Sequence, residues 1–243
     1  MTRFSKITLF VQCLVDGVYP HVGEALVEIF EGLGLKVDVP LRQTCCGQPA
    51  YNSGYQNAAR KAARHFIETF ESAEVIVCPS GSCVDMVVRH YPELFTGEPR
   101  WRQRAEAVAA KTFEFTQFLV DALGVTDVGA RFSGTVTYHD SCHLKRCLGV
   151  AEQPRALISA VEGATLVEME DSDRCCGFGG TFAVKYPEIS TGMLEEKVAN
   201  ILATGADSVV GCDLSCLMHI QGMLSRRKLP VQTLHIAELL VSK

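Results

Sequence analysis

The triplet Cys-Cys-Gly occurs twice in this chain of 243 residues, at 45–47 and at 175–177, and each copy is the centre of a longer repeat. The segments that match around it are TLFVQC and VTYHDSC, ALVEIFEG and ALISAVEG, and AEVIVCPSGSC and ADSVVGCDLSC. The offset between matched segments stays between 129 and 133 residues. A matched series in the same order, at a nearly constant offset, indicates an internal duplication. The chain is therefore expected to fold as two similar halves.

Each half has the same predicted order of elements. A short β-rich run ends in a cysteine, and a helix follows it. A second strand leads into Cys-Cys-Gly and then into a longer amphipathic helix, over 54–72 and over 186–204. A third strand ends in a loop with the last cysteine. Because strands that alternate with helices form βαβ units, we predict an α/β fold of two tandem, pseudo-symmetric βαβ-type repeats with a mostly parallel sheet.

The repeats are predicted to span residues 1–98 and 130–243. Between them, residues 99–129 have apolar side chains at helical spacing, which predicts a connecting helix packed on the core. The last segment, VQTLHIAELLV at 231–241, predicts a closing strand and helix.

Four cysteines recur in register in each half. The carboxyl ends of parallel strands meet at one edge of a sheet, so the four thiols of each half are expected to converge there. Four thiolates match an iron–sulfur cubane, and zinc also accepts four. Adjacent cysteines favour the cluster, and the glycine after them lets backbone N–H groups approach sulfur. The predicted ligands are Cys13, Cys45, Cys46 and Cys83 in the first half and Cys142, Cys175, Cys176 and Cys216 in the second.

This doubled Cys…CCG…Cys pattern, together with SCLMHIQG at 215–222, resembles the CCG cysteine-rich domain family, and within it the branch that serves lactate utilisation. The family also includes the cysteine-rich subunit of heterodisulfide reductase and the iron–sulfur subunit of glycolate oxidase. The resemblance implies two [4Fe-4S] clusters and electron transfer in a cytoplasmic complex that oxidises L-lactate to pyruvate. It also implies two partners, a ferredoxin-type iron–sulfur subunit and a third small subunit.

The chain departs from the five-cysteine form of the family, which ends in Cys-x-x-Cys. Aligned on the last cysteine, the extra thiol would fall at Ser80 and at Asp213. Cys78 and Cys212 lie nearby, at places that do not match each other, and both are candidate fifth ligands. Two alternatives remain open: a thiol/disulfide redox protein similar to heterodisulfide reductase, and a structural zinc-binding interaction protein.

Histidines surround the first cysteine of the second half. The segment YHDSCHLKRC at 138–147 places His139 and His143 beside Cys142, and His219 lies one turn beyond Cys216. For His139 and His143 we favour hydrogen-bonded side chains that fix the loop over proton carriers near a cluster. Cys147 has no counterpart in the first half, and we expect an ordinary thiol there.

Several function classes are disfavoured. A net charge of −5 without a basic cluster argues against nucleic acid as a partner. No apolar run reaches the ~20 residues of a membrane span, and the start MTRFSKITLFVQCLV has no cleavage site for a signal peptide. Eleven cysteines then indicate a cytoplasmic chain whose thiols are reduced or metal-bound.

Motifs for a complete redox enzyme are also missing from the sequence. GFGG at 177–180 lacks the lysine and glycine spacing of a phosphate-binding loop, and no flavin or nicotinamide motif is present. We therefore predict a non-flavin electron-transfer subunit, working in a complex whose substrate is a small hydroxy acid.

Overall fold

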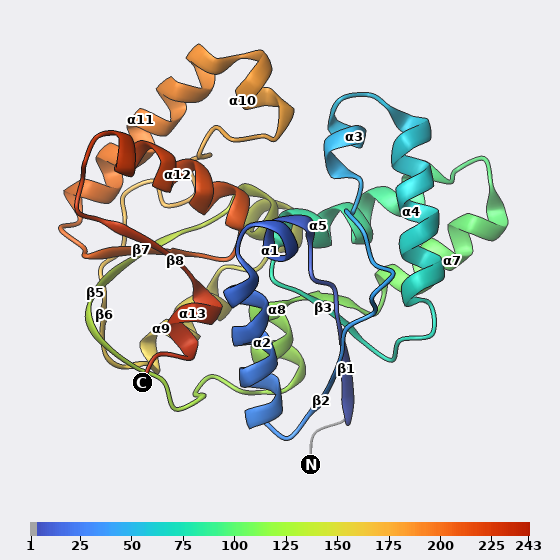
Figure 1. The fold of residues 1–243 in the computed structure, drawn as a ribbon, viewed down its shortest axis with the longest axis horizontal. Helices are drawn as coiled ribbons and strands as arrows, with labels where there is room; N and C mark the ends of the chain where they lie inside the picture. The colour runs from blue at the N-terminus through green and yellow to red at the C-terminus, as the bar shows by residue number, and fades with distance from the viewer. Residues whose placement is uncertain (1–3) are drawn as a thin grey trace. The chain divides into compact units, whose positions relative to one another are not determined.

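The computed structural model describes residues 4–243. Contacts within the chain separate two compact units, Met1–Leu123 and Gly124–Lys243. Each unit contains one four-stranded sheet in which every strand pairing is parallel, with helices packed around it (Figure 1). The predicted α/β fold of two tandem repeats with parallel sheets is confirmed.

The first unit has the strand order β2-β1-β3-β4. Its strands are β1 (Lys6–Leu9), β2 (Lys36–Asp38), β3 (Ile76–Cys78) and β4 (Thr112–Glu114). Its helical segments are α1 (Cys13–Gly17), α2 (Pro20–Gly32), α3 (Gln48–Asn52), α4 (Gln56–Phe70), α5 (Gly81–Asp85), η1 (Met86–His90), α6 (Tyr91–Leu94), α7 (Pro99–Ala109), α8 (Phe115–Gln117) and η2 (Phe118–Ala122), where η marks a π-helical turn.

The second unit repeats this order as β6-β5-β7-β8. Its strands are β5 (Arg131–His139), β6 (Glu162–Leu166), β7 (Ser208–Gly211) and β8 (Gln232–His235). Its helical segments are η3 (His143–Cys147), α9 (Glu152–Ser159), α10 (Thr181–Lys185), α11 (Pro187–Ala203), α12 (Leu214–Arg226) and α13 (Ile236–Leu240).

Helices cover both faces of each sheet. In the second unit, α11 and α12 pack together on one face and α9 and α13 on the other (Figure 1). In the first unit, Phe30 of α2 packs edge-on against Phe115 of α8, while Phe10 beyond β1 packs against Phe66 of α4. Because the central strands are covered on both sides, consecutive residues at their carboxyl ends are buried, where a half-exposed strand would alternate.

The region 99–129 differs from the predicted connecting helix. It contains the helix α7, then β4, and then the short helical segments α8 and η2. Strand β4 pairs with β3 and completes the first sheet. The prediction failed because β4 is only three residues long and Phe113 is its one apolar residue, too little for a strand period to show.

The segment β4–α8 is the counterpart of β8–α13, which the sequence predicted as a closing strand and helix and the structure confirms. In both units the last strand residue caps the helix that follows. The Glu114 carboxylate accepts hydrogen bonds from the backbone N–H groups of Thr116 and Gln117, and the His235 ring accepts one from Ala237. The duplication therefore extends to all four strands of each sheet.

The long helices α4 and α11 bury the same positions. Their buried residues match at an offset of 131 and are Ala59, Ala63, Phe66, Ile67 and Phe70 in α4 and Ser190, Leu194, Lys197, Val198 and Ile201 in α11. Two pairs change from apolar to polar, because Ala59 is matched by Ser190 and Phe66 by Lys197. The Lys197 ammonium donates to the backbone carbonyl oxygens of Asp171 and Ser172, at 2.9 and 3.0 Å.

Burial lowers the pKa of Lys197 to about 8, from 10.5. Between these two values the unfolded chain holds more protons on this side chain than the folded one, so the free energy of unfolding rises with pH. Lys197→Met removes this dependence. We therefore expect the free energy of unfolding of the variant to exceed that of the wild type most near pH 8, and this difference to shrink towards pH 10.5.

Urea denaturation of the metal-free, reduced protein across this pH range measures the difference. The exposed Lys185→Met is the matched control and should keep the slope of the wild type. Parallel pH profiles for Lys197→Met and wild type would contradict the assignment.

Candidate metal centres

All eight matched cysteines lie at the carboxyl ends of the parallel strands. In the first unit, Cys13 opens α1 after β1, the Cys-Cys-Gly triplet precedes α3, and Cys83 lies in the first turn of α5 after β3. In the second unit, Cys142 directly precedes η3, the triplet precedes α10, and Cys216 lies in the first turn of α12. The last cysteine of each unit was predicted in a loop, but it lies in the first turn of a helix, where the helix dipole favours a thiolate.

In the first unit the four thiols form one continuous series of contacts. Cys13 is hydrogen-bonded to Cys45, and Cys45 is hydrogen-bonded to Cys46. The Sγ atoms of Cys46 and Cys83 are 3.4 Å apart. The fold therefore gathers four thiols from three chain segments into a single group, which we call the first quartet.

The second unit forms an equivalent second quartet. Cys142 is hydrogen-bonded to Cys175, Cys175 to Cys176, and Cys176 to Cys216. None of these cysteines forms a disulfide in the part of the chain that the structure describes. Each unit thus presents four reduced thiols in the same order.

Each quartet has an outer and an inner pair. In the first quartet Cys13 is exposed and Cys45 half-buried, and in the second both Cys142 and Cys175 are half-buried. The inner pairs are buried and consist of Cys46 with Cys83 and of Cys176 with Cys216. One side of each thiol group therefore faces solvent and the other faces the protein core.

The first cysteine of each Cys-Cys pair is the most acidic thiol of its quartet. Hydrogen bonds from Cys13 and Cys46 lower the pKa of Cys45 to about 2, and those from Cys142 and Cys176 lower the pKa of Cys175 to about 2. The thiolate is the form of cysteine that binds metal. Each quartet therefore contains a preformed thiolate between two thiol donors.

The glycine after each Cys-Cys pair is required by the backbone. Gly47 and Gly177 both have φ of +84°, a left-handed conformation that favours glycine. Their N–H groups point at the sulfur atoms of Cys45 and Cys175, at 3.5 and 3.4 Å. A Cβ atom at position 177 would lie 2.6 Å from the carbonyl oxygen of Ser190.

Polar side chains hold the loops of each quartet together. In the first unit, the Gln43 side chain accepts a hydrogen bond from the Val11 N–H at 2.8 Å. In the second unit, the buried carboxylate of Asp140 accepts from Ser172 at 2.7 Å and from Arg155 at 2.8 and 3.0 Å. Burial raises the pKa of Asp140, but these hydrogen bonds outweigh it and leave that pKa lowered. The loops with the first and the paired cysteines are thereby tied to each other.

The two positions where a fifth family cysteine would fall are helix caps. The Ser80 hydroxyl accepts a hydrogen bond from the Cys83 N–H at 3.3 Å, and the Asp213 carboxylate accepts from the Ser215 N–H at 3.2 Å. Such caps satisfy the first N–H groups of α5 and α12. These two residues therefore orient the helices of the last cysteines.

Three cysteines remain besides the eight matched ones. Cys78 ends β3 and Cys212 follows β7, and both are buried. The Cys212 thiol and the Tyr138 hydroxyl are 3.2 Å apart. Cys147 ends η3 and is half-buried. That Cys78 and Cys212 are fifth ligands stays a prediction.

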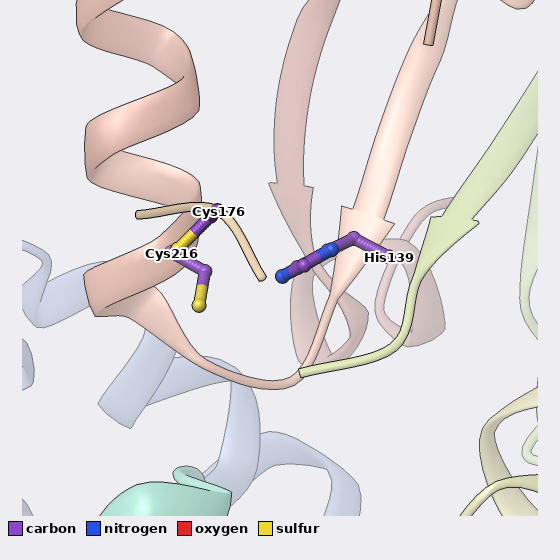
Figure 2. A group of neighbouring side chains, drawn as sticks. All are labelled: His139, Cys176 and Cys216. Carbon is purple, nitrogen blue, oxygen red and sulfur yellow. The ribbon is translucent and has the colours of Figure 1, made fainter. Parts of the chain in front are cut away.

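One histidine differs from its prediction. His139 ends β5 and is buried, and among the residues that the structure describes neither ring nitrogen has an oxygen or nitrogen partner, while the Cys216 thiol interacts with the ring. Its ring points at Cys176 and Cys216, and the three donor atoms lie within 4.8 Å of one another (Figure 2). The sequence placed His139 near the site, but the lack of oxygen or nitrogen partners depends on tertiary packing that no spacing reveals.

The other two histidines have neighbours of their own. The His143 Nδ1 atom lies 3.6 Å from the Cys142 sulfur. The His219 Nε2 atom lies 3.2 Å from the Ser190 hydroxyl, which itself donates to the Gly177 carbonyl at 2.8 Å. Burial lowers the pKa of His219.

The fold and the two quartets define a protein of two cysteine-rich α/β domains. The family description "Cysteine-rich domain" (CCG) matches residues 7–87 and 136–221, and the chain belongs to the CCG cysteine-rich domain family. The clustered cysteines and the family together suggest metal or iron–sulfur binding.

Two curated relatives match this chain over nearly their full length, and both have the same name. Lactate utilization protein A of Exiguobacterium sp. is 55% identical over 97% of this chain and 96% of the relative. Lactate utilization protein A of Bacillus cereus is 52% identical over 98% of this chain and 99% of the relative.

A solved structure supports the fold alone. The crystal structure of a hypothetical protein from Helicobacter pylori matches 98% of this chain with a TM-score of 0.68 and 9% identity. This chain spans about half the length of that protein, 49%. Within residues 4–243, no helix has both the length and the apolar character that crossing a membrane needs.

The glycine requirement can be tested in the second quartet. Gly177→Ala adds a Cβ against the Ser190 carbonyl in a left-handed backbone. Left-handed strain alone is of order 1–3 kcal/mol, and the close contact adds to it. We expect a lower free energy of unfolding and less metal bound by the second quartet.

The matched control is Gly205→Ala. Its φ of +67° is also positive, but no heavy atom beyond its chain neighbours lies within 4 Å of the added Cβ in the described chain. It should show the backbone strain without the loss of metal. Equal metal retention by the two variants would contradict the role of the close approach.

Proposed function

We propose that the protein is an iron–sulfur electron-transfer subunit of a cytoplasmic complex that oxidises L-lactate to pyruvate. The observation that supports this most is the pair of thiol quartets, each drawn from three segments and each with a preformed thiolate. Four thiolates are the ligand number of a [4Fe-4S] cluster. The names of the relatives support the lactate pathway as the setting.

The two quartets would each hold one cluster, which when bound supplies a one-electron carrier. In this proposal the inner cysteines exclude water from one side, while the outer cysteines leave the other side open to electron exchange. The N–H groups of Gly47 and Gly177, directed at sulfur, stabilise negative charge on the thiolates.

The partners in the proposal are a ferredoxin-type iron–sulfur subunit and a third small subunit. Apolar side chains beside the first quartet support a docking surface there. Leu41 is 99% exposed, and with Val39, Cys13 and Cys45 it lines a cavity of about 200 Å³. A cytoplasmic location is part of the proposal, because thiolate ligands need a reducing compartment.

Metal analysis tests the proposal directly. Protein purified without oxygen should contain about eight irons and about eight acid-labile sulfides per chain, as two four-iron clusters require. About half of both would mean that one quartet holds no such cluster. Zinc without sulfide would overturn the electron-transfer proposal and favour a structural zinc protein, whereas thiols without metal would favour a thiol/disulfide redox protein.

The independence of the two quartets gives a second test. Cys45→Ser removes the thiolate from the first quartet and should reduce the iron from about eight to about four atoms per chain. Cys175→Ser should do the same to the second quartet. The matched control is Cys147→Ser, which lies outside both quartets and should keep all the iron. Loss of all the iron in either single variant would contradict two separate sites.

A further inference from the structure

His139 is a buried imidazole whose ring faces thiols instead of oxygen or nitrogen partners. It is 1% exposed, and neither ring nitrogen has an oxygen or nitrogen partner within residues 4–243, whereas the Cys216 thiol interacts with the ring. A buried polar group in this state calls for an explanation, and a role as ligand to an ion or bound group is one of the few available. The side chain points at the inner pair of the second quartet, Cys176 and Cys216 (Figure 2).

The donor set around His139 is that of a metal ligand group. One imidazole nitrogen and two thiol sulfurs lie within 4.8 Å of one another, all on buried residues. The Cys176 and Cys216 thiols are also hydrogen-bonded to each other, so the two sulfurs and the ring form one contiguous group. Imidazole and thiolate are both ligands of zinc and of iron–sulfur centres.

The first unit lacks this donor. Phe10 and His139 each lie three residues before the first cysteine of their quartet. Phe10 packs edge-on against Phe66, with ring centroids 4.8 Å apart. In the second unit the same two places are occupied by His139 and Lys197, both buried. Beside the second quartet, an imidazole and an ammonium group therefore occupy the places that an aromatic pair occupies in the first unit.

The other histidines near the second quartet are in different positions. His143 lies at the outer end, with its Nδ1 atom 3.6 Å from the sulfur of Cys142, and His219 interacts with the Ser190 hydroxyl. Neither belongs to the group of three close donor atoms. His139 is therefore the imidazole that the geometry selects.

We propose that His139 is a nitrogen ligand of the metal centre in the second unit, beside Cys176 and Cys216. The second centre then has mixed thiolate and imidazole coordination, whereas the first has thiolates alone. The inference rests on the proposed function only in that the second quartet must hold metal. It names a ligand, and it holds for an iron–sulfur cluster and for zinc.

Mixed coordination makes the two centres unequal. Replacing or supplementing thiolate by neutral imidazole raises the reduction potential of an iron–sulfur centre. Lys197 acts in the same direction as a buried positive group near Cys176 and Cys216. The second centre is thus the higher-potential one.

The first test uses the wild-type chain, labelled with ¹⁵N only at its histidines and purified without oxygen. Pulsed electron paramagnetic resonance of the reduced protein should show one strongly coupled nitrogen whose frequency changes with the label. If the metal is zinc, X-ray absorption at the zinc edge should show one nitrogen donor among sulfurs. All-sulfur coordination of the second centre, or a second unit without metal, overturns the proposal.

The second test compares two ring substitutions. His139→Phe gives the second unit the residue of the first, and it should lose the nitrogen coupling and shift the midpoint potential of one centre to lower values. His143→Phe is the matched control and should keep both. Loss of the nitrogen coupling in His143→Phe but not in His139→Phe would show that His143 is the ligand and would overturn the proposal. If His139→Phe fails to fold, the labelled wild-type protein still decides.

A third variant separates ligation from charge. Lys197→Met should lower the same midpoint potential while the nitrogen coupling stays unchanged. An unchanged potential would contradict the effect of the buried ammonium group.

The results distinguish this inference from the proposed function. Iron and sulfide without a coupled nitrogen would overturn the role of His139 and leave the electron-transfer proposal standing. Zinc with one nitrogen donor would support the role of His139 and overturn the electron-transfer proposal.

Discussion

Parallel pairing between β1 and β3, and between β5 and β7, is the constraint on which both quartets depend. Parallel strands end at the same edge of a sheet, so cysteines some seventy residues apart in the sequence arrive beside each other. The Cys-Cys-Gly triplet follows an outer strand and reaches the same edge. If either strand were antiparallel, its cysteine would lie at the opposite edge of the sheet, and only three thiols of the quartet would remain together.

Much of this arrangement could be predicted from the sequence, because each half can be compared with the other. A cysteine that recurs at the same place in both halves indicates a ligand, and Cys46 and Cys176 are recognisable as ligand candidates for that reason although both are buried. The strand β4 escaped prediction because three residues carry too little periodicity to separate a strand from the end of a helix. The caps Ser80 and Asp213 were noticed only as missing cysteines, since a cap depends on where a helix begins.

In the second unit, side chains around the site differ from those of the first unit, while the backbone that positions the site is the same. Ser190 takes the place of Ala59 and Lys197 that of Phe66, yet the helix buries the same positions in both units. The backbone at Gly47 and Gly177 is the same within a degree in φ. Polar groups have entered next to the second quartet, where the His139 ring faces two thiols. Polar replacements therefore lie beside the second quartet, while the strand order and the glycine turn are the same in both units.

The division of each quartet into an outer and an inner pair has a consequence for assembly. Cys13 and Cys45 are reachable from solvent while Cys46 and Cys83 are already packed in the core. A metal group held as proposed can be delivered to the finished fold through the outer pair, without unfolding the sheet. The same opening admits oxygen and chelators, so the ease of loading and the vulnerability to damage have one structural origin.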